Sequence, residues 1–111
     1  MNCIFCQVIA GEIPAQVVYR DDAVIAIRDI QPQAPTHLLV MPIAHSSDIG
    51  ELEQSGDAAL IGHLFAVAAR LGRESGGGFR LVVNTGAEAG QTVDHTHVHV
   101  LAGRFMEWPP G

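Results

Sequence analysis

His95, His97 and His99 are spaced two residues apart within the run 95–101, HTHVHVL. Thr, Val and Leu favour extended backbone, so a strand is expected over 96–102. Side chains of a strand alternate between faces, with neighbours on one face roughly 7 Å apart. The three imidazoles are therefore expected to share a face, close enough to act on one small ligand.

Crowded imidazoles oppose one another's protonation, so at least one of the three should be neutral and nucleophilic near pH 7. Three neutral imidazoles and a water make a catalytic zinc arrangement, but three successive positions on one face reach too far for a single metal unless the strand bends. Alternatively, one imidazole attacks phosphorus while its neighbours hold the phosphate oxygens. A third interpretation is a polar strand face with incidental histidines, and the uniformly apolar opposite face argues against it.

The segment 84–92, NTGAEAGQT, favours the covalent route. It joins a strand expected over 79–83 to the histidine strand and is rich in glycine and short polar side chains. Glycine lets backbone N–H groups approach an anion closely, so this loop is a candidate phosphate cradle. The glycines 76–78 are instead expected to end a helix, because no Gly-Lys-Ser/Thr follows them as a P-loop requires.

The remaining pattern predicts an α+β fold. A long helix should run from 56 or 57 to 74, because leucine and valine recur there at helical spacing. His63, on this helix, is expected to face solvent or fill the edge of the core. The other expected elements are a helix at 5–10, strands at 17–19, 23–27 and 37–41, a turn at Asp21-Asp22, a loop at 29–35 and a turn near His45 capped by Ser46 or Ser47.

The composition limits the classes of partner. The 111 residues are expected to form one domain, 1–111, and 48% hydrophobic residues exclude a disordered chain. A formal net charge of -6 argues against nucleic acid, although local groups can hold the phosphate of a mononucleotide. No apolar run approaches the roughly 20 residues that span a membrane, and no export signal is recognised, so a cytoplasmic location is expected.

Cys3 and Cys6 are the two cysteines of the chain, three positions apart. Without an export signal, this spacing favours reduced thiols or a metal clip over a structural disulfide. The alternative is two buried cysteines that act only as small apolar residues.

The histidine run resembles the histidine triad (HIT) motif, in which three histidines alternate with hydrophobic residues. Further segments resemble the nucleotide-binding Hint branch of that superfamily, in the same order along nearly the whole chain. They are Ile4-Phe5, Glu12-Ile13-Pro14, Arg28-Asp29-Ile30, 32–39, Val82-Val83-Asn84, Gly90-Gln91-Thr92-Val93, Gly103-Arg104 and Trp108-Pro109-Pro110-Gly111.

This resemblance implies a HIT fold, a five-stranded antiparallel sheet with two helices, paired into a homodimer with a ten-stranded sheet. It also implies an adenosine 5'-monophosphoramidase, a hydrolase that cleaves the P–N bond of nucleoside 5'-phosphoramidates through a nucleotidyl-histidine intermediate. The implied ligands are a purine nucleotide, AMP or GMP, and its phosphoramidates, and the chemical step needs no cofactor. The alternatives are a dinucleoside polyphosphate hydrolase using the same histidine, and a nucleotide-binding or protein-interaction module with incidental hydrolysis.

The catalytic residues follow from the same resemblance. His97 matches the nucleophile, and His99 and His37 match its flanking partners. Thr92 completes this set, and His95 lies at the edge of the site. The branch often has serine where Thr92 stands; threonine keeps the hydroxyl and adds a methyl group.

The resemblance also assigns substrate contacts. Asn84 and Gln91, together with Thr92 and His99, match phosphate contacts, and Asp29 matches the acceptor for the ribose hydroxyls. The apolar slot for the base corresponds to Ile4, Phe5, Val8, Ile13, Ile30 and Leu39. Trp108 corresponds to a tryptophan that lies near the site of the partner subunit.

Two more features carry implications. Cys3 and Cys6 with His45 and His95 resemble the zinc set of some bacterial-type members, and two thiolates with two imidazoles suit tetrahedral zinc. A structural zinc is therefore expected. Asp94 precedes the triad where an aromatic or apolar residue is usual, and its carboxylate is expected to bond an imidazole or face water.

Overall fold

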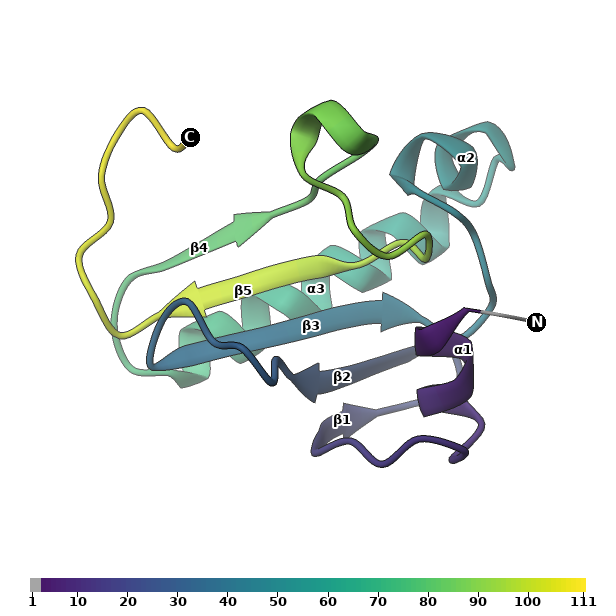
Figure 1. The fold of residues 1–111 in the computed structure, drawn as a ribbon, viewed down its shortest axis with the longest axis horizontal. Coiled ribbons are helices and arrows are strands. Elements are labelled where there is room, and N and C mark those ends of the chain that lie inside the picture. The colour runs from purple at the N-terminus through teal and green to yellow at the C-terminus, as the bar shows by residue number, and fades with distance from the viewer. Residues whose placement is uncertain (1–2) are drawn as a thin grey trace.

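A five-stranded antiparallel sheet organises residues 3–111, the part of the chain that this computed structural model describes (Figure 1). The strand order is β1-β2-β3-β5-β4, so β3 and β5 are neighbours at the centre. The elements are α1 (Ile4–Ile9), β1 (Val17–Arg20), β2 (Val24–Arg28), β3 (Thr36–Pro42), α2 (Ile49–Gln54), α3 (Ala58–Glu74), β4 (Phe79–Val82), the 3-10 helix η1 (Ala87–Ala89) and β5 (Val98–Ala102). The expected α+β fold with a five-stranded antiparallel sheet is confirmed.

The long helix α3 covers one face of the sheet. Asp57 caps its first turn by accepting the Leu60 N–H at 3.0 Å, and the chain turns away at Gly76, whose φ of +92° suits glycine. Helix and sheet enclose a buried core of Val24, Ala26, Leu38, Val40, Leu64, Val67, Ala68, Val98 and Val100. The side chains of β5 that alternate with its histidine are thus held in this core.

The short helix α1 lies over part of the opposite face (Figure 1). Its Phe5 packs with side chains of β2 and β3 in a second cluster, made of Phe5, Ile25, Ile27, Leu39 and Met41. Leu39 is paired in register with His99 of β5. Because directly paired residues share a face, the histidines lie on the same face as this cluster, beside α1.

The histidine strand is shorter than expected. Prediction placed it over 96–102, but β5 begins at Val98, opposite Val40 of β3. Thr96 bonds elsewhere: its N–H donates to the Ser46 carbonyl at 2.8 Å, and its side-chain oxygen lies 2.6 Å from the Ser46 hydroxyl. The segment before β5 is therefore held by the turn after β3, and His95 and His97 lie outside the strand.

Helix α2 was not predicted. Ser46 and Ser47 were expected to cap a turn near His45, yet the N-cap is Asp48, which accepts the Glu51 N–H at 2.8 Å. The Glu51 carboxylate in turn accepts the N–H and hydroxyl of Ser47. This reciprocal capping starts a helix of only 6 residues, too short for an apolar period to reveal it.

Over residues 3–111, no helix combines the length and apolar character needed to cross a bilayer. The longest, α3, has 17 residues.

Replacing Thr96 by valine tests how the triad segment is anchored. The change leaves the buried Ser46 hydroxyl without its partner, so the free energy of unfolding should fall by about 1–3 kcal/mol in a urea titration. Thr85→Val, at an exposed loop position, is the matched control and should stay within about 0.5 kcal/mol of wild type. Equal stability of the two variants would show that the Ser46 contact does not hold this segment.

Candidate active site

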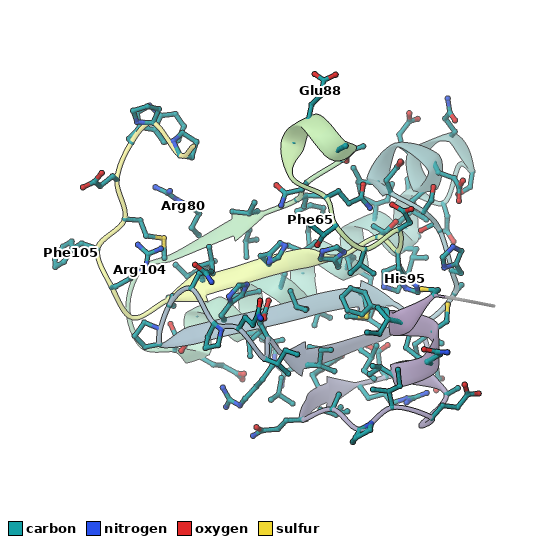
Figure 2. All side chains as sticks on the ribbon, in the orientation of Figure 1. Phe65, Arg80, Glu88, His95, Arg104 and Phe105 are labelled. Atoms are coloured by element: carbon teal, nitrogen blue, oxygen red, sulfur yellow. The ribbon has the colours of Figure 1, made fainter. Side chains whose placement is uncertain are left out.

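Five aromatic rings lie next to one another on the face of the sheet that α1 partly covers. The Phe5 ring packs edge-on against His95 and His97, with centroids 6.0 and 5.1 Å away. His97 is 5.0 Å from His99, and His99 is 5.2 Å from His37, by ring centroids. The three catalytic histidines of the sequence prediction are thus adjacent, and His95 lies beside α1 (Figure 2).

The orientation of His97 is set by the backbone. Its ring is 7% exposed, and Nδ1 lies 2.6 Å from the His95 carbonyl oxygen. A carbonyl only accepts hydrogen bonds, so this contact places a proton on Nδ1. In the neutral ring the lone pair is then on Nε2, the nitrogen that can act as a nucleophile.

A second backbone contact sets the state of His37. The Gln33 N–H donates to His37 Nδ1 at 3.0 Å, so the neutral ring carries its proton on Nε2. That nitrogen lies 2.9 Å from His99 Nδ1 and 3.4 Å from an Asp29 oxygen. His37 therefore donates to His99, whose own proton is on Nε2.

Burial favours the neutral form of His99 and His37. Burial, followed by the charges of the neighbouring His97 and His37, lowers the pKa of His99 to about 4, against a smaller opposing effect of the Asp29 carboxylate. Burial also lowers the pKa of His37, against a smaller opposing effect of the Asp29 carboxylate. Neutral rings can donate and accept at once, which the His37–His99 contact requires.

A second cluster joins α1, the turn after β3 and the triad segment. His95 Nε2 lies 2.8 Å from the Pro42 carbonyl, which leaves the Nδ1 lone pair facing the cluster. That Nδ1 is 3.4 Å from Cys3 Sγ, 3.6 Å from Cys6 Sγ and 3.2 Å from His45 Nδ1. His45 Nδ1 is 3.4 Å from Cys6 Sγ.

These separations match the edges of a zinc tetrahedron. Zn–S bonds of about 2.3 Å and Zn–N bonds of about 2.05 Å give N–N and S–N edges of roughly 3.3–3.6 Å. Burial, followed by the hydrogen bond and charge of Cys3, raises the pKa of the Cys6 thiol. A divalent cation among the four donors would offset this repulsion between thiolates, so the donor set of Cys3, Cys6, His45 and His95 fits the expected metal.

Asp29, His37 and His99 also bring potential ligand atoms within 4.8 Å of one another. His37 does not suit a metal here, because its Nδ1 accepts from Gln33 while Nε2 keeps the proton. A neutral imidazole has a single lone pair to offer. The geometry therefore describes a hydrogen-bonded chain.

The expected phosphate loop is built around glycine. Gly86 and Gly90 have φ values of +84° and +91°, a region that favours glycine, and η1 lies between them. Gln91 closes the loop: its side-chain amide donates to the Ser47 and Val93 carbonyls and its oxygen accepts the Gly86 N–H. Asn84, Thr92 and Asp94 lie on the partly buried and exposed flanks of the loop.

The apolar residues expected around the base differ widely in how exposed they are to solvent. Phe5 and Leu39 are buried in the cluster under α1, and Val8 packs against it. Ile4 is 47% exposed and Ile13 is partly buried. The structure does not gather Ile30 or Trp108 with them, because these side chains are 93% and 81% exposed.

His63 belongs to a separate contact. Its Nε2 lies 2.6 Å from an Asp21 oxygen, and the Tyr19 hydroxyl donates to the same oxygen at 2.6 Å. With its side chain 42% exposed, His63 links α3 to the β1–β2 turn. This agrees with the expected place at the edge of the core.

Sequence reasoning did not identify three backbone groups of the site. The His95 and Pro42 carbonyls and the Gln33 N–H decide which nitrogen of each ring carries the proton. Any residue type has these groups, so no side-chain pattern could have revealed them. Of the three positions, only Pro42 stands out in the sequence, because a proline is expected to end the strand.

The fold and these rings define a class of α+β proteins that present a histidine motif on one face of an antiparallel sheet. The HIT domain family matches residues 10–106, and the chain belongs to this family. HIT-like proteins described as uncharacterized, from Synechocystis sp. and Synechococcus elongatus, are 46% and 45% identical to it, each over 99% of this chain and 97% of their own.

Solved structures agree with this membership. A HIT family hydrolase from Legionella pneumophila has a TM-score of 0.93 and 45% identity, covering 99% of this chain and 100% of that one. A HIT family hydrolase from Clostridium thermocellum has a TM-score of 0.89 and 39% identity, covering 96% and 94%. The similarity extends over essentially the whole described structure.

The low pKa of His99 predicts a pH-dependent stability. Because the folded value of about 4 lies below the usual 6.5, the unfolded chain binds more protons between these values. The contribution of His99 to the free energy of unfolding is therefore fully present above about pH 6.5 and is lost as the pH falls toward 4. From pH 7 to 5, wild type should lose about 1–2 kcal/mol more than His99→Asn in urea titrations. Equal losses would show that His99 is not held neutral.

Proposed function

We propose that this protein is a hydrolase that cleaves the P–N bond of nucleoside 5'-phosphoramidates, chiefly those of adenosine, through a nucleotidyl-His97 intermediate. The observation that carries the proposal is the 2.6 Å contact between His97 Nδ1 and the His95 carbonyl. It orients the ring so that, in its neutral form, the lone pair is on Nε2, as nucleophilic attack on phosphorus requires. The hydrolase activity named for the structural relatives supports the same class of reaction.

The chemistry divides into two displacements. His97 Nε2 attacks phosphorus, a new P–N bond forms, and the bond to the leaving amine breaks as that nitrogen takes up a proton. Water then attacks the same phosphorus, the bond to Nε2 breaks, and the nucleoside monophosphate leaves with the ring restored. Imidazole suits both steps, because it is a good nucleophile and a good leaving group at phosphorus.

The surrounding groups are assigned by charge and position. His99, held by His37, faces the His97 ring and is proposed to stabilise the phosphate as its charge shifts. Asn84, Gln91 and Thr92 are proposed as further phosphate contacts. The Gln91 amide would have to give up a bond to the Ser47 or Val93 carbonyl to do so.

The nucleoside is proposed to lie along the cluster under α1. Asp29 stands beside His37, where an ionised carboxylate would accept bonds from the two ribose hydroxyls. The base would contact Phe5 and Leu39 with the more exposed Ile4 and Ile30 at the margin. AMP is the proposed product, with GMP as the second purine.

Zinc is proposed to be structural. Cys3, Cys6, His45 and His95 would hold it, fastening α1 to the triad segment, and when bound it supplies a fixed positive charge among the four donors. His97 and His99 stay outside this set, so the proposed chemical step uses no metal.

A homodimer with a ten-stranded sheet completes the proposal. β4 is an edge strand whose Phe79 is 39% exposed, and the nearby Phe105 and Trp108 are 103% and 81% exposed. An apolar sheet edge gains from being covered by a second copy. A cytoplasmic location and a single domain over 1–111 remain predictions from the sequence.

Replacing His97 by asparagine removes the nucleophile and keeps a polar side chain of similar size. Turnover of an adenosine 5'-phosphoramidate should fall by at least about 10³-fold, while AMP binding in a calorimeter stays within about tenfold. A panel of adenylate amides and dinucleoside polyphosphates, assayed with wild type, identifies the substrate class. Near-wild-type turnover by His97→Asn would reject the assignment, and preference for dinucleoside polyphosphates would reject the phosphoramidase.

The zinc proposal separates stability from chemistry. Chelation should lower Tm by roughly 10 °C or more, because metal binding contributes directly to folding. Below the unfolding transition, kcat should change by less than about threefold, because the metal takes no part in the step. Cys6→Ser should reproduce the loss of stability.

Two outcomes would contradict this role. Metal analysis that finds well under one zinc per chain, in protein purified without chelator, would reject the site. Complete loss of turnover on chelation, restored by zinc, would instead support a metallohydrolase.

A further inference from the structure

We propose that Arg104 is a positioning residue that holds the loop before β3 and thereby fixes the tautomer of His37. The kinetic part of this inference rests on the function proposed above, and the structural part does not. Arg104 follows β5 where the chain turns toward its C-terminus (Figure 2). The loop between β2 and β3, residues 29–35, lies next to it.

The contacts pass through one residue of that loop. Arg104 Nε donates to the Gln33 carbonyl at 2.8 Å. The N–H of the same Gln33 donates to His37 Nδ1 at 3.0 Å. His37 Nε2 then lies 2.9 Å from His99 Nδ1. Three hydrogen bonds thus join the exposed guanidinium to the ring beside the nucleophile.

A steric contact brings the two segments together. Gly103, with φ of +97°, lies so close to the loop that a Cβ built on it would be 2.9 Å from Pro35 Cβ. Only glycine permits this approach and this backbone conformation. Gly103 therefore packs on Pro35 while Arg104 reaches Gln33, and the pair fixes the loop at two points.

At its start the loop is tied to β3, because the Asp29 N–H donates to the His37 carbonyl at 3.0 Å. Two further bonds are internal to the loop. The Asp29 carboxylate accepts the Gln31 N–H at 2.8 Å, and the Gln33 side chain donates to the Gln31 carbonyl at 3.1 Å. These contacts shape the loop without tying Gln33 to the sheet. The second Arg104 bond, to the Phe105 carbonyl at 3.1 Å, keeps the guanidinium in place.

The tautomer of His37 matters because its ring has two neutral forms. If Gln33 moves away, the proton can sit on Nδ1, and Nε2 then accepts a bond in place of donating one. His99 Nδ1 would have to become the donor, which moves its proton away from Nε2. The ring next to His97 would face the phosphate with the opposite hydrogen-bonding character.

The test compares Arg104→Ala and Arg104→Lys in the full-length, zinc-loaded protein. Arg70→Ala is the matched control, because Arg70 makes a surface ion pair with Glu74 on α3, away from the loop. The first readout is the ¹⁵N spectrum of the imidazoles near pH 7, which distinguishes Nδ1–H from Nε2–H rings. The second is kcat and KM for an adenosine 5'-phosphoramidate.

For Arg104→Ala we expect the His37 signals to shift from the pure Nε2–H form toward a mixture. We expect kcat to fall about three- to tenfold, with a smaller change in KM, the effect of one solvent-accessible charged hydrogen bond. Arg104→Lys, which keeps a donor, should recover part of both changes, and Arg70→Ala should match wild type.

An unchanged His37 tautomer in Arg104→Ala would overturn the inference. So would a shifted tautomer with unchanged kcat, if wild type does turn over the substrate. A shifted tautomer in a protein whose wild type lacks phosphoramidate turnover would instead retain the positioning contact and reject the proposed function.

Discussion

Hydrogen bonds from imidazole rings to backbone groups are the interactions on which this site depends. The His95 carbonyl holds His97 by Nδ1, and the Pro42 carbonyl holds His95 by Nε2. As a result, adjacent histidines of one short segment present opposite nitrogens. His95 turns its Nδ1 lone pair to two thiols and His45, whereas His97 keeps Nε2 free on the sheet face. The proposed metal cluster and the proposed phosphorus chemistry therefore use different histidines of the same motif.

The packing of the sheet makes this division stable. Val98 and Val100 are fully buried beneath α3, so the intervening His99 is directed to the other face. On that face Phe5 of α1 lies against both His95 and His97. Helix α1 is capped by Cys3, whose sulfur accepts the Cys6 N–H. The cluster of Cys3, Cys6, His45 and His95, helix α1 and His97 thus form one continuous set of contacts. Burial lowers the pKa of both His37 and His99 and so favours their neutral forms.

The sequence was sufficient to predict the fold class, the succession of the main helices and strands along the chain, and the grouping of the histidines. These depend on alternation and helical spacing, which follow from side-chain type. The sequence was not sufficient for the start of β5, since the pairing of Thr96 with Ser46 depends on tertiary contact. The sequence also did not predict α2, because a helix of 6 residues is too short to show an apolar period. The roles of the Gln33 N–H and the Pro42 carbonyl could not be predicted, because backbone groups carry no residue-specific signal. Residue roles at Asn84, Thr92 and Trp108 still rest on the resemblance.

The central claim is that His97 becomes covalently bonded to the nucleotide during turnover, and trapping that species tests it most directly. Wild-type protein would be mixed with excess adenosine 5'-phosphoramidate and quenched within milliseconds in alkali, which preserves a bond between phosphorus and histidine nitrogen. Mass spectrometry of the digested chain should then find an adenylyl group on the peptide carrying His97, located on that residue by fragmentation. Substrate consumed with no adduct at any quench time, or an adduct on another histidine, would contradict the account.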